Sequence, residues 1–407
     1  MGLLQNIDNI RKDFPILKQE VNGRPLAYLD NGATSQSPRQ VIEASRAYYE
    51  EYNSNIHRGT HKLARIATQA HEHARETIAK YVHAKHSEEV IFTSGTTDSI
   101  NLVANIVDKQ LSSGDEILIS THEHHSNIVP WQMLCQRTGA QLRVIPMLDS
   151  GLLDLSNIDE IINPNTKILS ITHVSNALGV INPVSDLIKK AKAHGAITII
   201  DGAQAIPHLA IDVTELGSDF YVFSAHKVYA PTGIGILWGK KELLELLPPW
   251  RGGGEMIKQV TFEKTTYNTL PFKYEAGTPN IEGGIALAAA FNWVSEIGID
   301  NITSHEHALQ TYATSQLREI ENIHIYADVA DKAGVISFNI KNVHHYDLGS
   351  LIDQMGVAVR TGHHCCQPLM QRLDITGTVR ASFAVYNTTE ECDQLVHAVK
   401  KASMMLS

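Results

Sequence analysis

The chain has 407 residues, of which 43% are hydrophobic and 19% charged, so it can bury a large core without a disulfide framework or a structural metal. No apolar run approaches the roughly 20 residues that a membrane-spanning helix needs, so we expect no membrane contact. The formal net charge is -10, from 34 Lys and Arg against 44 Asp and Glu, and no basic run could follow a phosphate backbone, which argues against a nucleic-acid partner.

The first 15 residues alternate apolar and charged side chains at helical spacing and predict an amphipathic helix. They contain neither the continuous apolar stretch nor the small-residue cleavage site of a signal peptide. We therefore expect a cytoplasmic protein.

Residues 88 to 238 alternate short β-branched segments with helical ones. The predicted strands lie within residues 89–95, 115–121, 142–148, 167–175, 196–204, 219–227 and 233–239. Segments between them, such as residues 98–111 and 184–195, repeat apolar residues every three to four positions. Because strands that are nearly all apolar are covered on both faces, this series predicts an α/β fold, with a mainly parallel sheet sandwiched by helices.

After about residue 285 the pattern changes to two long helices, then strands at residues 333–341, 356–362 and 378–387 with helices at 346–356 and 389–406. This series predicts a smaller α+β domain. We place the large domain at residues 19–284, and the small domain at residues 1–18 and 285–407. The loop RTGHHCCQP, residues 360–368, lies between two strands of the small domain, and long ordered loops often carry functional residues.

The residues that follow the strands are candidates for a site, because ligands of a parallel sheet bind at the carboxyl ends of its strands. Gly95, Thr96 and Thr97 open a helix whose free backbone N–H groups can attract a phosphate. Asp201 and Lys227 follow two other strands. Each of these features is common on its own. A turn of this kind often only caps a helix, and an Asp or Lys after a strand is often a solvated surface side chain.

Together these features fit one cofactor, pyridoxal phosphate (PLP). A lysine amine forms a Schiff base with its aldehyde, an aspartate keeps its pyridine nitrogen protonated, and a helix N-terminus binds its phosphate. His124, in the sequence EHHSN after another strand, then fits a ring stacked on the face of the cofactor.

The paired histidines and cysteines suggest a metal site less strongly. Adjacent Cys365 and Cys366 would form a disulfide only through a strained ring. Zinc ligands are usually spaced as C-x2-C or H-x3-H, because neighbouring side chains of an extended chain point in opposite directions. We therefore expect no metal, and a metal-binding protein is the less favoured hypothesis.

Nine segments of the chain resemble the SufS-type (group II) cysteine desulfurases, which are class-V aminotransferase-like PLP enzymes of fold type I. They are YLDNGAT, SGTTDSINLVA, EHHSNIVPWQ, THVSNALG, DGAQ, SAHKVYAPTGIGILWG, GGGEMI, EAGTPN and RTGHHCCQPL. The resemblance extends from about residue 13 to the end of the chain, so it implies the fold of this family for the whole chain.

The resemblance also implies roles for the residues at matching positions. Lys227 would bind the cofactor covalently, Asp201 would pair with its pyridine nitrogen and Gln204 would donate to its phenolic oxygen. His124 would stack on the ring and belong to the catalytic residues with Lys227 and Cys365. The residues expected at the phosphate are Thr96, Thr97, Ser224, His226 and, from the second subunit of a homodimer, Thr278.

The substrate implied by the resemblance is L-cysteine, bound by Asn176, Arg380 and Arg360, with Asn176 and Arg380 holding its α-carboxylate. Cys365 would take the sulfur as a persulfide and leave L-alanine. A SufE- or SufU-like acceptor would then receive the sulfur for iron–sulfur cluster assembly in the SUF system. A selenocysteine lyase acting on L-selenocysteine is an alternative, whereas the cysteine loop argues against an aminotransferase or an epimerase.

Three points stay open at the level of sequence. Arg360, His363 or His364 either favours the thiolate of Cys365 or only shapes the loop. Cys366, where the family usually has a small residue, either fills space or reacts with the persulfide. Ala230 stands where the family often has Gly, and it would be strained if that position needs a positive φ.

Overall fold

The computed structural model describes residues 2–406, so the ends of the predicted small domain, Met1 and Ser407, lie outside the described residues. Its centre is a seven-stranded sheet in the order β4-β10-β9-β8-β7-β5-β6. The strands are β4 (Val90–Thr93), β5 (Glu116–Ser120), β6 (Gln141–Ile145), β7 (Thr166–Thr172), β8 (Ile197–Asp201), β9 (Phe220–Ser224) and β10 (Gly235–Gly239). Strand β10 alone runs in the direction opposite to the other six strands of this sheet, which confirms the predicted α/β fold with a mainly parallel sheet.

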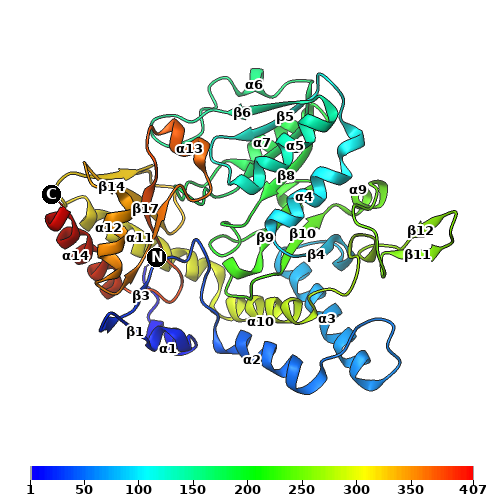
Figure 1. Ribbon diagram of the computed structural model, residues 1–407, viewed down its shortest axis with the longest axis horizontal. Helices are drawn as coiled ribbons and strands as arrows, with labels where there is room; N and C mark the ends of the chain where they lie inside the picture. Colours follow the sequence, from blue (N-terminus) through cyan, green and yellow to red (C-terminus); the bar gives the residue numbers. More distant parts are fainter. Residues whose placement is uncertain (1, 407) are drawn as a thin grey trace.

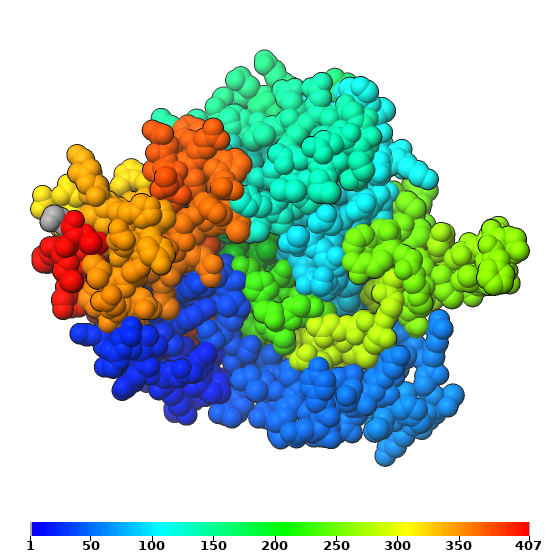
Figure 2. Space-filling view, viewed as in Figure 1, coloured from blue at the N-terminus to red at the C-terminus, as the bar shows by residue number. Residues whose placement is uncertain are grey.

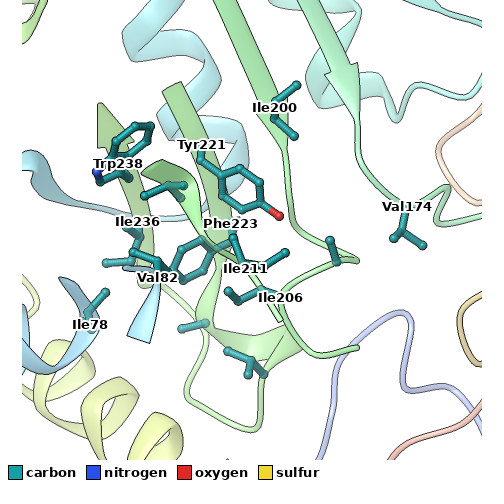
Figure 3. Close-up of a cluster of buried hydrophobic side chains, with 14 of the residues drawn as sticks. Ile78, Val82, Val174, Ile200, Ile206, Ile211, Tyr221, Phe223, Ile236 and Trp238 are labelled. Carbon is teal, nitrogen blue, oxygen red and sulfur yellow. The ribbon is translucent and has the colours of Figure 1, made fainter. Parts of the chain in front are cut away.

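Helices cover both faces of this sheet (Figure 1). The alternation of β9 shows how the sequence specifies two layers: Phe220 and Val222 enter one apolar cluster, and Tyr221 and Phe223 enter the other. Helices α4 (Thr96–Ile106) and α5 (Val129–Thr138) supply the first cluster. The second receives side chains from α3 (Lys62–Tyr81), α7 (Val184–Ala193) and α10 (Ile281–Ile297), and Figure 3 shows part of it around Tyr221 and Phe223.

A second, antiparallel sheet has the order β13-β14-β17-β16. Its strands are β13 (Ile323–Tyr326), β14 (Val335–Ile340), β16 (Arg360–Gly362) and β17 (Thr378–Ser382). Helices α11 (Ile299–Leu317), α12 (His345–Asp353) and α14 (Thr389–Leu406) share an apolar cluster with it. In Figure 1 this small sheet lies beside the large one, with the N-terminal strands below it.

The N-terminal segment contacts both parts. The predicted first helix is present as α1 (Ile7–Lys12), where Arg11 pairs with Glu391 of α14 at 2.8 Å, while Ile10 enters the core of the large sheet. Strand β3 (Ala27–Tyr28) pairs in parallel with β15 (Val357–Ala358) of the C-terminal part. The division of the chain at residue 285 stays a prediction, and that residue lies within α10, which packs against the large sheet.

Several elements were not predicted. They are the short strands β1 (Glu20–Val21) and β2 (Arg24–Pro25), the helices α2 (Arg39–Ala47), α3, α6 (Ile158–Ile161), α8 (Val213–Leu216), α9 (Lys241–Leu246) and α13 (Gln367–Arg372), and the strands β11 (Ile257–Val260), β12 (Thr265–Tyr267) and β13. Strands β11 and β12 form a mostly exposed hairpin that projects from the body of the molecule (Figure 2). None of the helices within residues 2–406 is long and apolar enough to cross a bilayer.

A close backbone contact fixes the position of the turn before α4. Gly95 precedes this helix with φ 150°, and a Cβ atom on Gly235 of β10 would lie 2.4 Å from the Cα atom of Gly95. Such a separation is far below van der Waals contact, so β10 needs glycine at this position. The strand next to β9 therefore supports the turn predicted to bind phosphate.

We expect Gly235→Ala to lower the free energy of unfolding by about 1–3 kcal/mol, because the added methyl group forces β10 away from Gly95. Urea denaturation measures this change. Gly252→Ala is the matched control, since no atom lies within 4 Å of a Cβ built there. Equal stability of Gly235→Ala and the unchanged protein would contradict the close contact.

Candidate active site

A cavity of about 300 Å³ lies at the carboxyl ends of β8 and β9, where the small sheet and the N-terminal segment meet the large sheet. The predicted site residues that line it are Thr96, Thr97, His124, Asn176, Asp201, Gln204, Ser224, His226, Lys227, Arg360, Cys365 and Arg380. Thr278 lies elsewhere, exposed at a second cavity with Trp250 and Arg251. The fold thus brings together residues that are spread over most of the chain.

Lys227 ends the short helix that follows β9, and it reaches across the cavity to the N-terminal segment. Its Nζ donates to the carbonyl oxygens of Gly32 at 2.5 Å and Ala33 at 2.8 Å. Burial, with a contribution from the charge of Arg380, lowers the pKa of Lys227 to about 7. The amine can therefore accept a proton near neutral pH, as a general base must.

Asp201 is the last residue of β8, and its carboxylate is buried at the cavity wall. One oxygen accepts a hydrogen bond from the backbone N–H of Ala203 at 2.9 Å. Burial raises the pKa of Asp201 to about 6, while that hydrogen bond and the charge of Lys227 act in the opposite direction. A cationic partner in the cavity would favour the carboxylate form.

The phosphate end of the predicted site is formed by the start of α4 and the end of β9. The backbone N–H of Thr96 donates to Ser224 Oγ at 2.8 Å, and the hydroxyl groups of these residues also lie 2.8 Å apart. His226 is half-buried, and its Nδ1 is a buried atom without a hydrogen-bond partner. The hydroxyl groups at a helix N-terminus and the unpaired ring nitrogen of His226 suit an anionic group.

His124 presents a neutral ring to the cavity. Its Nδ1 accepts the backbone N–H of Ser126 at 3.1 Å, so the ring proton of the neutral form is on Nε2. Burial, aided by the charge of Lys227, lowers the pKa of His124 to about 4. A neutral ring at physiological pH is suited to stacking on a flat aromatic ligand.

The predicted substrate-binding residues occupy the side of the small sheet. Arg380 of β17 is 2% exposed, and its Nη1 donates to the backbone carbonyl of Asn176 at 2.8 Å. Arg360 of β16 is about half-exposed. Both guanidinium groups contact Asp30, a residue that the sequence did not identify.

The cysteine loop distinguishes its two thiols. Cys365 is exposed and lines the cavity, whereas Cys366 is fully buried. The thiol of Cys366 donates to Asn176 Oδ1 at 3.0 Å, and burial raises its pKa. Cys366 is therefore held as a neutral thiol that orients the Asn176 amide.

The two histidines of this loop make different contacts, one with the backbone and one with a side chain. The Cys365 N–H donates to His363 Nδ1 at 3.0 Å, and Nε2 of buried His364 lies 2.8 Å from the hydroxyl of Thr378. Burial lowers the pKa of His364 well below its usual value, so this ring is neutral at pH 7 and cannot stabilise a thiolate by charge. No group of three or more side chains suited to a metal ion occurs within residues 2–406.

Two features of the site were missed or left open by the sequence. The turn Asp30–Thr34 provides Asp30 and the carbonyls that bind Lys227, and Gln204 Nε2 also donates to Gly32 at 2.7 Å. The motif YLDNGAT was the sequence signal that could have identified this turn.

Ala230, which stands where the family often has Gly, does not have a positive φ. The positive φ of this segment belongs to Tyr229 (64°), so Ala230 carries no strain from a left-handed conformation.

These residues fit pyridoxal phosphate. The cavity offers an amine, a buried carboxylate, a neutral ring and an anion-binding turn with the unpaired His226 Nδ1, which are the groups that this cofactor uses. Asp201 ends β8, and Ser224 and Lys227 follow at the end of the neighbouring β9, so these three side chains line one cavity from adjacent strands.

Comparison with known proteins agrees with this fit. The Aminotransferase class-V family matches residues 27–395. A Halalkalibacterium halodurans protein named "Probable cysteine desulfurase" is 50% identical over 97% of this chain and 98% of its own length. A "Cysteine desulfurase" of Salmonella typhimurium is 48% identical over 98% of this chain and 99% of its own.

A solved structure gives the same result for the fold. The cysteine desulfurase CsdA of Escherichia coli, solved in an S-sulfonic acid form, is 39% identical and matches with a TM-score of 0.92 over 99% of this chain and 100% of its own.

Lys227 is expected to react as an amine with a midpoint near pH 7, because burial disfavours its charged form. Reductive methylation of the cofactor-free protein across a pH series, read by peptide mass, measures this midpoint. The exposed Lys189 serves as the reference. A Lys227 profile that coincides with that of Lys189 would rule out the effect of burial.

Cys365 is expected to react with iodoacetamide in the folded protein, while Cys366 stays unmodified until the protein unfolds, because its thiol is buried and hydrogen-bonded. Fragment ions of the shared peptide assign the label. Cys392, which is equally buried, is the internal control. Labelling of both thiols at one rate would contradict the distinction.

Proposed function

The chain belongs to the aminotransferase class-V family, and we propose that it works as a PLP-dependent cysteine desulfurase in which Cys365 takes the sulfur of L-cysteine and L-alanine is released. The observation that carries this proposal is that Cys365 and Lys227 face one cavity, together with Asp201. An enzyme that only exchanges amino groups has no need for an exposed thiol at this position. The resemblance to relatives named cysteine desulfurase supports the same reaction.

The cofactor, when bound, supplies an electron sink that makes the Cα–H bond of an amino acid acidic. Lys227 would hold it covalently at rest, with Asp201 at the pyridine nitrogen and His124 against the ring. Thr96, Thr97, Ser224 and His226 would hold the phosphate, and Gln204 would donate to the phenolic oxygen. The position of these residues around one cavity supports the roles that the family resemblance implies.

Lys227 would accept the α-proton of L-cysteine, because burial keeps much of its amine neutral at pH 7. Arg380, Arg360 and Asn176 would orient the α-carboxylate, since a guanidinium fork matches the two carboxylate oxygens. The thiolate of Cys365 would then attack the substrate sulfur. The carbon–sulfur bond breaks, the sulfur stays on Cys365 as a persulfide, and the three-carbon product gains protons to become alanine.

The setting of this reaction is part of the proposal. The exposed position of Cys365 suits transfer of the persulfide sulfur to an acceptor protein of the SufE or SufU kind, for iron–sulfur cluster assembly in the SUF system of the cytoplasm. Thr278 is exposed and lies away from the candidate active site of its own chain. This position suits a homodimer in which Thr278 reaches the phosphate bound by the other subunit.

Incubation of the holoenzyme with L-cysteine is expected to give alanine and a persulfide on Cys365, located by peptide mass. Cys365→Ser should lower alanine formation by a factor of about 100 or more, because a serine hydroxyl does not replace the thiolate nucleophile. Cys135→Ser, in α5, is the control. Full activity of Cys365→Ser would assign the sulfur to Cys366, and parallel assays with L-selenocysteine test the lyase alternative.

A further inference from the structure

The carboxylate of Asp30 occupies both arginines proposed to bind the substrate. Arg360 Nε lies 3.1 and 3.2 Å from the two carboxylate oxygens of Asp30, and its Nη2 lies 3.0 Å from Oδ2. Arg380 Nη2 lies 3.4 Å from Oδ1. A carboxylate of this chain thus takes the forked contact that arginine offers to a carboxylate of a ligand.

The burial of Asp30 and Arg380 makes their contact significant, whereas Arg360 is about half-exposed. The side chain of Asp30 is 16% exposed and that of Arg380 only 2%, so water screens their interaction little. The guanidinium group of Arg380 packs closely against the backbone turn, because a Cβ atom on Gly32 would lie only 3.1 Å from its Cζ. Its Nε is buried without a hydrogen-bond partner.

We propose that Asp30 is a positioning residue that occupies Arg360 and Arg380 in the free enzyme and yields them to the α-carboxylate of the incoming amino acid. The inference rests on the proposed role of these arginines in substrate binding. Asp30 holds both side chains in place and balances their charge, so the substrate carboxylate must compete with it. Asp30 thereby limits how strongly the site attracts any carboxylate.

The positive charges around the cavity explain what the carboxylate of Asp30 contributes to ligand selection. Two arginines beside Lys227 would otherwise present an excess of positive charge to every small anion in solution. A carboxylate that is already in place lowers this general attraction, and it can be replaced by a ligand that also makes contacts elsewhere in the cavity. The result is selection for amino acids over simple anions.

The test compares two reagents that alkylate Cys365, which lines the same cavity as both arginines. Iodoacetate carries a carboxylate, and iodoacetamide is its neutral counterpart of nearly equal size. The ratio of their rates at Cys365, read by peptide mass on the purified full chain, reports the attraction for a carboxylate independently of thiol reactivity. It needs no turnover of L-cysteine.

Asp30→Asn keeps the shape of the side chain and removes its charge, so we expect the iodoacetate to iodoacetamide ratio to rise about three- to tenfold. Asp30→Glu retains the charge and should keep the ratio near that of the unchanged protein. Asp30→Ser is a second uncharged variant, expected to behave as Asp30→Asn. Asp328→Asn removes a similar forked partner, of Arg318, that does not line the cavity, and should leave the ratio unchanged.

An unchanged ratio in Asp30→Asn and Asp30→Ser, or a rise in Asp30→Glu as large as in Asp30→Asn, would overturn the proposal, since either result means that the charge of Asp30 does not govern access of carboxylates. An enzyme that forms no alanine but shows the expected ratios would refute the proposed function alone. An active enzyme with unchanged ratios would refute the role of Asp30 alone.

Discussion

The turn Asp30–Thr34 is the contact on which the rest of the site depends. Its carbonyl groups accept the hydrogen bonds of Lys227 and Gln204 from the large sheet, and its carboxylate pairs with Arg360 and Arg380 of the small sheet. The turn is itself tied down, because the N–H of Gly32 donates to Ser382 Oγ at 2.7 Å. Five residues near the start of the chain therefore align functional groups from two separate cores.

Burial at this junction also shifts the pKa values of Lys227 and Asp201. Removal from water lowers the pKa of Lys227 and raises that of Asp201, so the same physical cause brings an amine and a carboxyl group toward pH 7 from opposite sides. Much of the Lys227 amine is then neutral at pH 7, with burial as the main cause and the charge of Arg380 as a contribution. Asp201, with a pKa of about 6, is mostly charged at pH 7, and a cationic partner in the cavity would stabilise that charge further.

The sequence predicted the parts of the site that obey a rule of the fold. Asp201 and Lys227 could be identified because strands of a parallel sheet end at one edge, and the apolar strands themselves were easy to recognise. Asp30 lies in an irregular segment, and its partner Arg360 is 330 residues away, so no local pattern links them. Helix α3 was missed because its buried face consists of Ala64, Ala67, His71, Ala74 and Arg75 before Ile78, which gives little apolar periodicity.

The cysteine loop shows why adjacency does not make two thiols equivalent. His364 and Cys365 both have positive φ, 51° and 57°, a conformation that costs roughly 1–2 kcal/mol for a residue with a side chain. The cost is met by hydrogen bonds to their carbonyls, from Asn176 Nδ2 at 2.7 Å and from the His125 N–H at 2.8 Å. This left-handed turn directs Cys365 to the cavity and Cys366 into the core. Since Cys366 in turn holds the Asn176 amide, the buried thiol helps to maintain the strained turn that exposes its neighbour.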